Sequence, residues 1–339
     1  MAWYNNKGND QDVVLSTRVR LARNLENLPF DLSRDDARQK ELIRMVGEQL
    51  VPTGYRQIDF ASLSDTEALS YVEKHLVSRE FAQKEGERAL FCNDSSTVAV
   101  MVGEEDHLRI QAILPGFALE DAWKAACACD GLLETALPYA YDGRLGYLTH
   151  CPTNLGTAMR ASAMLFLPAL RMAGQMDALT AQLSKIGLTV RGMYGEGTAP
   201  QGFLYQISNT APLGMREEDI LKKTGEVLEQ IIDRERKLRA SLTGSTLEKL
   251  CDRCCRAVGQ LRYARLLSSA ELLSLWADAR LGVALGAVTD VDYITLSRLL
   301  IGGMPATLTL SAQAAGQPLR DEGDRDRARA DFVQKTWIA

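Results

Sequence analysis

The sequence has no excess of positive charge and no long hydrophobic run. Its 39 Lys and Arg residues are outnumbered by 44 Asp and Glu, giving a formal net charge of −5, so no overall basic field attracts nucleic acid. The most apolar stretch, residues 163–174, is interrupted by Pro168 and Arg171 and is too short to span a bilayer. The polar start, MAWYNNKGNDQD, is unlike a signal peptide. We expect a cytoplasmic protein without direct contact to a membrane or to nucleic acid.

Histidine is scarce, with three residues, and the seven cysteines in a chain of this size are most simply reduced thiols. Cys251, Cys254 and Cys255 in CDRCC have a metal-like spacing, but no second pair lies nearby. Thiols on a helix are therefore a better interpretation than a zinc site, and we predict no metal site. His150 and Cys151 are neighbours in HCPTN, but adjacency in sequence says little about a Cys–His nucleophile pair.

Glycine-rich phosphate-binding motifs are also missing. The sequence has neither a GxxxxGK[ST] loop nor the VAIK, HRD and DFG set of protein kinases. If a nucleotide binds, arginine side chains must take the place of such a loop, since their forked donors suit phosphate oxygens. In STRVR at 16–20, Arg18 and Arg20 are two positions apart, so on an alternating strand they point to the same face. Any single arginine could equally form a surface salt bridge; the arginines in strand-like or otherwise unusual surroundings are Arg18, Arg20, Arg23, Arg109, Arg160 and Arg191.

The composition and pattern favour two globular domains. The chain has 339 residues, 46% of them hydrophobic and 24% charged. Strands are expected within 13–25, 89–102, 107–114, 158–170, 188–196 and 202–209, and helices at 35–51, 65–77 and 119–137. This irregular mixture favours an α+β fold, an antiparallel β-sheet flanked by helices, over a doubly wound parallel sheet. We predict one domain over residues 1–238 and a helical C-terminal domain over 239–339.

The C-terminal part, from residue 216 onwards, is expected to be helical. Thr243-Gly244-Ser245 should interrupt the first long helix. Ser268 and Glu271 form a plausible capping box for the next one. Thr289 and Asp290 are expected to cap a further helix.

An acidic turn, GEEDHLRIQ at 103–111, separates two of the predicted strands. A solvated hairpin turn would explain an isolated EED. A catalytic explanation complements the phosphate-binding arginines. A reacting guanidinium has a pKa above 12, so it attacks phosphorus only if another group orients it and accepts its proton. A carboxylate does both by accepting two parallel N–H bonds. Glu105 and Glu196 are the natural pair for this role.

Taken together, these residues resemble the phosphagen kinase family and, within it, the protein arginine kinases of the McsB type. CPTNLGT at 151–157 looks like the family signature CP[ST]N[LI]GT, and EEDHLR at 104–109 is similar to NEEDHLR. STRVR at 16–20 and RGMYGE at 191–196 resemble two further family motifs. The four matches occur in the family's order, and the resemblance implies the phosphagen kinase or glutamine synthetase-like catalytic fold.

The resemblance implies ATP, Mg²⁺ and transfer of the γ-phosphoryl group to a guanidino nitrogen. Glu105 matches the carboxylate that orients and deprotonates the guanidinium, Glu196 matches the second carboxylate, and Cys151 matches the cysteine near the substrate nitrogen. The implied nucleotide-binding positions are Ser16, Thr17, Arg18, Val19, Arg20, His75, Arg109, Arg160, Ala161, Ser162, Ala163, Met164, Arg191, Gly192, Met193, Tyr194, Gly195 and Glu196. Gly103 departs from the family, which has Asn before EEDH; glycine permits unusual backbone angles but supplies no side-chain hydrogen bond.

Two features favour an arginine in a protein over free arginine. STRVR begins at Ser16, so we expect no N-terminal helical domain that would enclose a small substrate. The tail RDRARA also resembles a phosphoarginine-binding allosteric motif of the McsB type, covering Arg325, Asp326, Arg327, Ala328, Arg329 and Ala330. A charged helix with ordinary i,i+3 and i,i+4 pairs is the plainer explanation of that tail. A kinase of free arginine and a non-catalytic phosphoarginine-binding adaptor remain alternatives.

The resemblance also implies partners that the residues themselves do not reveal. They are protein substrates with exposed arginines, a Clp-type ATPase that degrades marked proteins in a stress response, a stress-gene repressor and a zinc-containing activator protein. A homodimer is expected by analogy, and symmetric dimers are the commonest assembly of soluble proteins.

Overall fold

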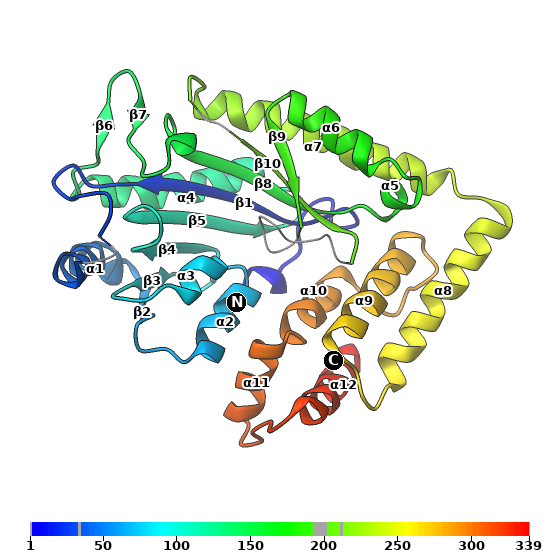
Figure 1. Cartoon of the computed structure of the whole chain (residues 1–339). Coiled ribbons are helices and arrows are strands. Elements are labelled where there is room, and N and C mark those ends of the chain that lie inside the picture. Colours follow the sequence, from blue (N-terminus) through cyan, green and yellow to red (C-terminus); the bar gives the residue numbers. More distant parts are fainter. Residues whose placement is uncertain (1, 33–34, 193–201, 211–212, 339) are drawn as a thin grey trace.

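A computed structural model describes residues 2–32, 35–192, 202–210 and 213–338. Within these residues an eight-stranded sheet runs in the order β2-β3-β4-β5-β1-β8-β10-β9, and neighbouring strands are antiparallel. Its strands are β1 (Val14–Arg23), β2 (Arg56–Asp59), β3 (Ala89–Cys92), β4 (Val98–Val102), β5 (Leu108–Pro115), β8 (Met159–Phe166), β9 (Leu188–Arg191) and β10 (Leu204–Asn209). A small hairpin, β6 (Tyr141–Asp142) and β7 (Gly146–Tyr147), stands apart. The predicted α+β fold is confirmed (Figure 1).

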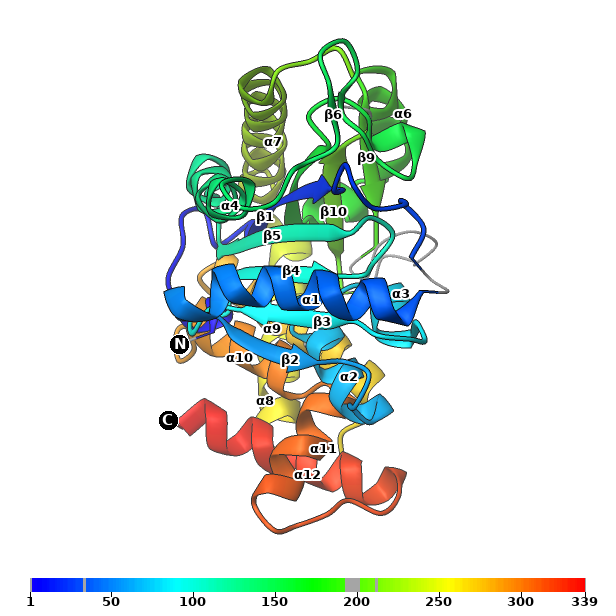
Figure 2. The same cartoon turned by 90° about the vertical axis from the view of Figure 1, so that its left-hand side faces the viewer.

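Helices cover one face of the sheet and part of the other. On the first face lie α1 (Asp36–Leu50), α4 (Leu119–Glu134), α5 (Pro168–Met172), α6 (Met176–Lys185) and α7 (Glu217–Ala240), around the largest hydrophobic core. On the second face lie α2 (Asp65–Glu73) and α3 (Arg79–Gln83), whose core includes Phe81 and Met101. Figure 2 shows α4 and α7 on one side of the strands and α2 on the other. Short 3-10 turns are Trp3–Asn5, Val51–Thr53 and Pro152–Asn154.

The central strand β1 places its side chains alternately on the two faces, as the period of a strand requires. Val19 and Leu21 are fully buried in the core beneath the helices. Arg18 and Arg20 therefore point to the opposite face, and the predicted shared face of these two arginines is confirmed. In the neighbouring strand β8, Arg160 lies directly opposite Arg20.

The C-terminal helices pack against the second face of the same sheet. They are α8 (Gly244–Tyr263), α9 (Ser269–Ala284), α10 (Tyr293–Gly302), α11 (Pro305–Ala314) and α12 (Glu322–Ile338). Their core includes Leu15, Met164, Phe166 and Leu204 from the strands, together with Trp276 of α9. The helical region thus shares a hydrophobic core with the sheet. No described helix is both long and apolar enough to cross a membrane.

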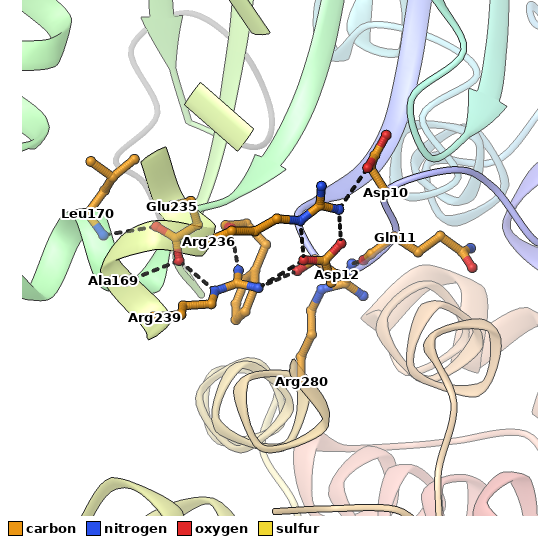
Figure 3. Close-up of polar contacts among 10 residues, drawn as sticks. Asp10, Gln11, Asp12, Ala169, Leu170, Glu235, Arg236, Arg239 and Arg280 are labelled. Carbon is orange, nitrogen blue, oxygen red and sulfur yellow. Dashed lines mark hydrogen bonds and ion pairs between the residues drawn. The ribbon is translucent and has the colours of Figure 1, made fainter. Parts of the chain in front are cut away.

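An ion-pair cluster joins α7 to the segment before β1 (Figure 3). Arg236 donates to Asp12 at 2.9 Å and to Asp10 at 2.7 Å. Arg239 donates to the backbone oxygen of Asp12 at 3.1 Å and to Glu235 at 2.8 Å. The fully buried Glu235 also accepts the first backbone N–H groups of α5. These contacts hold the start of β1 against α7.

Arg280 of α9 reaches the same segment from the C-terminal side. One guanidinium nitrogen donates to the backbone oxygen of Gln11 (Figure 3). The group is buried among the rings of Phe166, Trp276 and Tyr293, with centroid distances of 5.4, 5.5 and 4.9 Å. Burial lowers the pKa of Arg280 to about 10. Aromatic faces supply part of the stabilisation that a carboxylate would otherwise give.

Helix ends agree with the sequence in part: the helix predicted over 65–77 ends at Glu73, and the end of the strand predicted over 158–170 is wrong, because Pro168 opens α5. α7 ends at Ala240 and α8 begins at Gly244, so the predicted interruption at Thr243–Ser245 is present. Ser268 caps α9 by accepting from the backbone N–H of Glu271. The prediction of a cap at Thr289 or Asp290 is wrong, because Asp292 caps α10 through the N–H of Thr295 at 2.7 Å. Asp290 instead pairs with Arg262 of α8 at 2.8 Å. The boundary between residues 238 and 239 stays a prediction.

Candidate active site

A cavity of about 1020 Å³ opens on the second face of the sheet, where β1, β5, β8 and β9 meet the loops before and after α3. It brings together most of the side chains that the sequence singled out for chemistry. These are Arg18, Arg20, His75, Glu105, Arg109, Cys151, Arg160 and Arg191. Residues 193–201, which include Met193, Tyr194, Gly195 and Glu196, lie outside the described residues.

Several predicted nucleotide-binding positions point away from this cavity. The Thr17 hydroxyl donates to the carbonyl of Gly116 at 2.7 Å, beside the start of α4. Val19, Ala161 and Ala163 belong to the core under the helices. Ser16 on β1 and Gly192 after β9 do not line the cavity. On β8, Ser162 donates to the Arg18 carbonyl and Met164 packs against the C-terminal helices. A role in nucleotide binding stays a prediction for all these residues.

The arginines form a concentrated positive surface in the cavity. Burial, followed by the charge of Arg109, lowers the pKa of Arg18 to about 10. Burial also lowers the pKa of Arg20, and the charges of Arg18, Arg160 and Arg109 lower it further. Within the described residues, the Nε atom of Arg20 has no hydrogen-bond partner. Cations held this close repel one another, and a bound polyanion would relieve that repulsion.

The acidic turn between β4 and β5 gives its three acids different surroundings. Glu104 is 7% exposed; it accepts a hydrogen bond from Ser78 Oγ at 2.9 Å and pairs with Arg109. Asp106 is 1% exposed, and its Oδ1 atom accepts from the Asn24 side chain and from the backbone N–H of His150, both at 2.7 Å. Both are buried and hydrogen-bonded to neighbours, so they hold the turn in shape, although within the described residues the Oδ2 atom of Asp106 has no hydrogen-bond partner.

Glu104 and Glu105 both line the cavity, and Glu105 is the more exposed of the two. Its side chain is 42% exposed, and one carboxylate oxygen lies 3.4 Å from a guanidinium nitrogen of Arg109. Burial raises the pKa of Glu105, while the charge of Arg109 opposes that increase. A carboxylate with a raised pKa beside a cationic surface is suited to accept a proton.

The backbone of the turn explains the unusual glycine. Gly103 has a φ of +84°, a conformation that costs little for glycine and that asparagine tolerates better than most residues. Its N–H donates to the carbonyl of His107 at 2.9 Å and closes the turn. Lys84 donates to the carbonyls of Gly103 and Glu104 at 2.9 and 2.6 Å. The position requires a residue that accepts positive φ, and glycine satisfies that requirement.

His75 occupies a left-handed backbone position directly after α2, with a φ of +59°. The N–H of Leu76 bonds to the carbonyl of Tyr71 and that of His75 to Val72, which is the Schellman arrangement at a helix C-terminus. Glycine is usual at this place, so a histidine here indicates a use for its side chain. Burial, and then the charge of Arg18, lower the pKa of His75 to about 3. The imidazole is therefore neutral at pH 7 and adds no charge to the arginine cluster.

The loop that carries Cys151 is tied to the acidic turn. Cys151 lines the cavity, and its Sγ atom lies 3.0 Å from Thr153 Oγ1. The hydrogen bond from the N–H of His150 to Asp106 connects this loop to the residue after Glu105. Sequence reasoning did not identify Asp106, Asn24 or Lys84 as supports, because their partners lie far away along the chain.

The C-terminal motif lies on α12. Arg329 is 1% exposed and donates to the carbonyls of Gly303 and Leu267 at 2.8 and 2.6 Å and to Asp326 at 2.7 Å. Arg327 is exposed and pairs with Asp324 at 3.1 Å. Arg325 and Ala328 are half-buried and Ala330 is fully buried. The structure therefore places Arg329 inside the helical region, and phosphoarginine binding by this motif stays a prediction.

Comparisons with known proteins assign the chain to the guanidino phosphotransferases. The family of ATP:guanido phosphotransferases, through its C-terminal catalytic domain, matches residues 40–238. The C-terminal domain of protein-arginine kinase McsB matches residues 247–338. The chain belongs to the protein-arginine kinases within the ATP:guanido phosphotransferase family.

Curated relatives match over nearly the whole chain. A protein-arginine kinase of Brevibacillus brevis is 41% identical over 339 residues, covering 98% of this chain and 94% of the relative. One of Caldanaerobacter subterraneus is 40% identical over 330 residues, covering 96% of each. Both cover the sheet and the C-terminal helices, so the two regions occur together in these relatives.

Solved structures show the fold. The duplicated taurocyamine kinase of Schistosoma mansoni, with transition-state analogue components bound, has a TM-score of 0.61 and 23% identity. That match covers 79% of this chain and 40% of the duplicated chain. A lombricine kinase has a TM-score of 0.60 and 23% identity, with 69% of each chain covered.

Proposed function

We propose that this protein transfers the γ-phosphoryl group of ATP directly to a guanidino nitrogen of arginine side chains in proteins. The observation that carries the proposal is the position of Glu105, which faces the cavity beside Arg109 and the other arginines. The similarity to protein-arginine kinases over both regions of the chain supports a protein substrate over free arginine.

The arginines hold the triphosphate in this proposal. Arg18, Arg20 and Arg160 come from adjacent strands and present guanidinium groups on one face of the sheet. Fixed cations in a partly closed cavity stabilise charge on the moving phosphoryl group without reorganising, which lowers the barrier to transfer. Arg109 and Arg191 complete the cationic lining.

Glu105 acts on the substrate arginine. Its carboxylate accepts N–H bonds from the guanidinium, which fixes the plane of that group in line with the leaving phosphate. As the nitrogen–phosphorus bond forms and the bond to the β-phosphate oxygen breaks, ADP leaves and the nitrogen's proton moves to Glu105. Glu196 is proposed as the second carboxylate, and Cys151, which lines the same cavity, as the thiol beside the substrate nitrogen.

Mg²⁺ is part of the proposal as the partner of the nucleotide. The described residues contain no group of three or more His, Cys, Asp or Glu arranged to hold a metal ion. In this proposal the ion is held chiefly by phosphate oxygens and water, as Mg²⁺ usually is. When bound, it would neutralise phosphate charge alongside the arginines.

Replacing Glu105 with glutamine tests the assigned role. The amide keeps the shape but does not accept the proton, so we expect kcat to fall at least about a thousandfold while ATP still binds. Calorimetric titration with ATP and a coupled assay for ADP measure the two quantities. Glu120→Gln, on the exposed surface of α4, is the matched control and should behave like the wild type. Near wild-type phosphorylation by Glu105→Gln would refute the role.

A second comparison separates the two substrate classes. The wild-type enzyme is incubated with ATP and either free arginine or a denatured protein, and the products are analysed by mass spectrometry without acid, because the N–P bond is acid-labile. Phosphate on the protein and none on free arginine is the expected result. Phosphorylation of free arginine alone would favour a phosphagen kinase, and no ATP turnover with either would favour an adaptor.

The cellular role is proposed from the family resemblance. Phosphorylated proteins would be substrates for a Clp-type ATPase–protease during stress, with a stress-gene repressor among the targets and a zinc-containing protein as activator. A homodimer and a phosphoarginine site on α12 belong to the same proposal. Arg325 and Arg327, which are half-buried and exposed, are the arginines of that helix available to a phosphate.

A further inference from the structure

A carboxylate from the catalytic region caps a helix of the C-terminal region. Glu73 is the last residue of α2, and its two carboxylate oxygens accept the backbone N–H groups of Ala306 and Thr307 at 2.9 and 2.7 Å. These are among the first N–H groups of α11, which lies beside α2 in Figure 1 and Figure 2. This pair of hydrogen bonds thus joins Glu73 to residues that follow it by 233 and 234 positions in the sequence.

The N-terminus of α11 depends on this outside partner. Pro305 opens the helix and has no N–H to donate, and the residue before it, Met304, makes no side-chain cap. A helix N-terminus leaves several N–H groups without partners inside the helix and favours a negative charge. Glu73 supplies both an acceptor for two of these groups and the charge. Within the same region, Arg329 of α12 holds the carbonyl of Gly303, two residues before Pro305.

The chain that follows Glu73 leads directly into the nucleotide cavity. Lys74 is the C-cap of α2, and its carbonyl accepts the indole N–H of Trp3 at 3.0 Å. His75 comes next, in the left-handed conformation, and its carbonyl accepts from Gln111 at 2.8 Å. The imidazole lines the cavity beside the arginines. A single residue therefore separates a contact with the C-terminal helices from a side chain of the candidate site.

We propose that Glu73 is a positioning residue: by anchoring the end of α2 to α11, it holds His75 in place against the bound nucleotide. The position of the C-terminal helices then affects the nucleotide affinity of the cavity through this contact. The inference rests on the proposed function, since it takes the nucleotide to be the ligand of the cavity. The contact of Arg280 with Gln11 in Figure 3 also joins the two regions, but it holds the segment before β1 and not a residue that lines the cavity.

The test compares Glu73→Gln with Glu67→Gln. Glu67 lies on the same helix and caps its N-terminus on the exposed side, so it controls for loss of a charge from α2. Binding of ATP with Mg²⁺ is measured by calorimetric titration, and kcat and both KM values are measured with a denatured protein substrate. For Glu73→Gln we expect the Kd and the KM for ATP to rise roughly tenfold, because this is the effect of losing one hydrogen bond to a charged group. The kcat at saturating ATP and the KM for protein should stay within about twofold.

A double variant distinguishes positioning from general stability. His75→Gly removes the side chain and places glycine at a positive φ, which the backbone accepts. If Glu73 acts through His75, Glu73→Gln will not weaken ATP binding further in the His75→Gly background. Independent, additive losses, or a lowered unfolding temperature with unchanged ATP affinity, would overturn the inference. A wild-type protein that does not bind ATP would instead refute the proposed function.

Discussion

At the scale of the residue, three adjacent acids have three different environments. Glu104 and Asp106 are buried and hydrogen-bonded to residues of other loops, whereas the Glu105 side chain is exposed at the cavity. Alternation along the chain does not explain this, because a turn has no regular period. The sequence predicted Glu105 through its motif, but the burial of its neighbours depends on their partners, Ser78, Asn24 and the loop at His150.

His75 should make the protein sensitive to acid. Its pKa is about 3 in the folded chain and about 6.5 when unfolded, so between these values the unfolded chain binds a proton that the folded chain does not. The free energy of unfolding should therefore fall as the pH is lowered through that range. Urea unfolding at pH about 7.5 and about 5 should show that His75→Gln loses less stability than the wild type, by about 2 kcal/mol. If the wild type and His75→Gln lost equal free energy of unfolding between the two pH values, the lowered pKa of His75 would be contradicted.

At the scale of the element, the longer strands were predicted well, whereas β2 and the β6–β7 hairpin were missed and the helix ends were less accurate. The strand at 13–25 is β1, and the alternation in STRVR placed two arginines on one face correctly. The cap of α10 was misplaced by two residues or more, since Thr289, Asp290 and Asp292 are all suitable residue types. Tertiary packing decided among them: Asp290 pairs with Arg262 of α8 and leaves the cap to Asp292.

The segment before β1 provides an element-scale prediction. Asp12 accepts from both Arg236 and the buried Arg239, whereas Asp10 accepts from Arg236. Asp12→Asn should lower the free energy of unfolding by about 2 kcal/mol, because Arg239 loses a partner while it remains buried. Asp10→Asn, the matched control, should cost under about 1 kcal/mol, as for a more exposed pair. Chemical denaturation measures both, and equal losses would show that burial of Arg239 does not matter.

At the scale of the whole molecule, the C-terminal helices and the sheet are continuous in their packing. Phe166 of β8 contacts the ring of Trp276 in α9, with centroids 5.9 Å apart. Leu15, Met164 and Leu204 belong to the same core. The two regions that the sequence separated as domains therefore share apolar surface as well as the contacts of Arg280 with Gln11 and of Glu73 with α11.

Shared packing predicts joint unfolding. Phe166→Ala should lower the free energy of unfolding by about 3–5 kcal/mol, as for a fully buried phenylalanine. Hydrogen exchange should show faster opening of both β8 and α9, because the cavity left behind faces both. Phe91→Ala, in the core beneath α1, serves as the control and should loosen the sheet more than α9. Loss of protection confined to β8 in Phe166→Ala would indicate independent domains.

The sequence by itself determined most strands of the large sheet, the shared face of Arg18 and Arg20 and the order of the motifs. These follow from local rules, chiefly the two-residue period of a strand, and local rules need no knowledge of distant neighbours. Only the tertiary structure decided that Glu105 faces the cavity, that His75 is neutral and that Glu73 caps α11. Burial and partners depend on residues that are brought together from far apart in the chain, and no local pattern records which ones will meet.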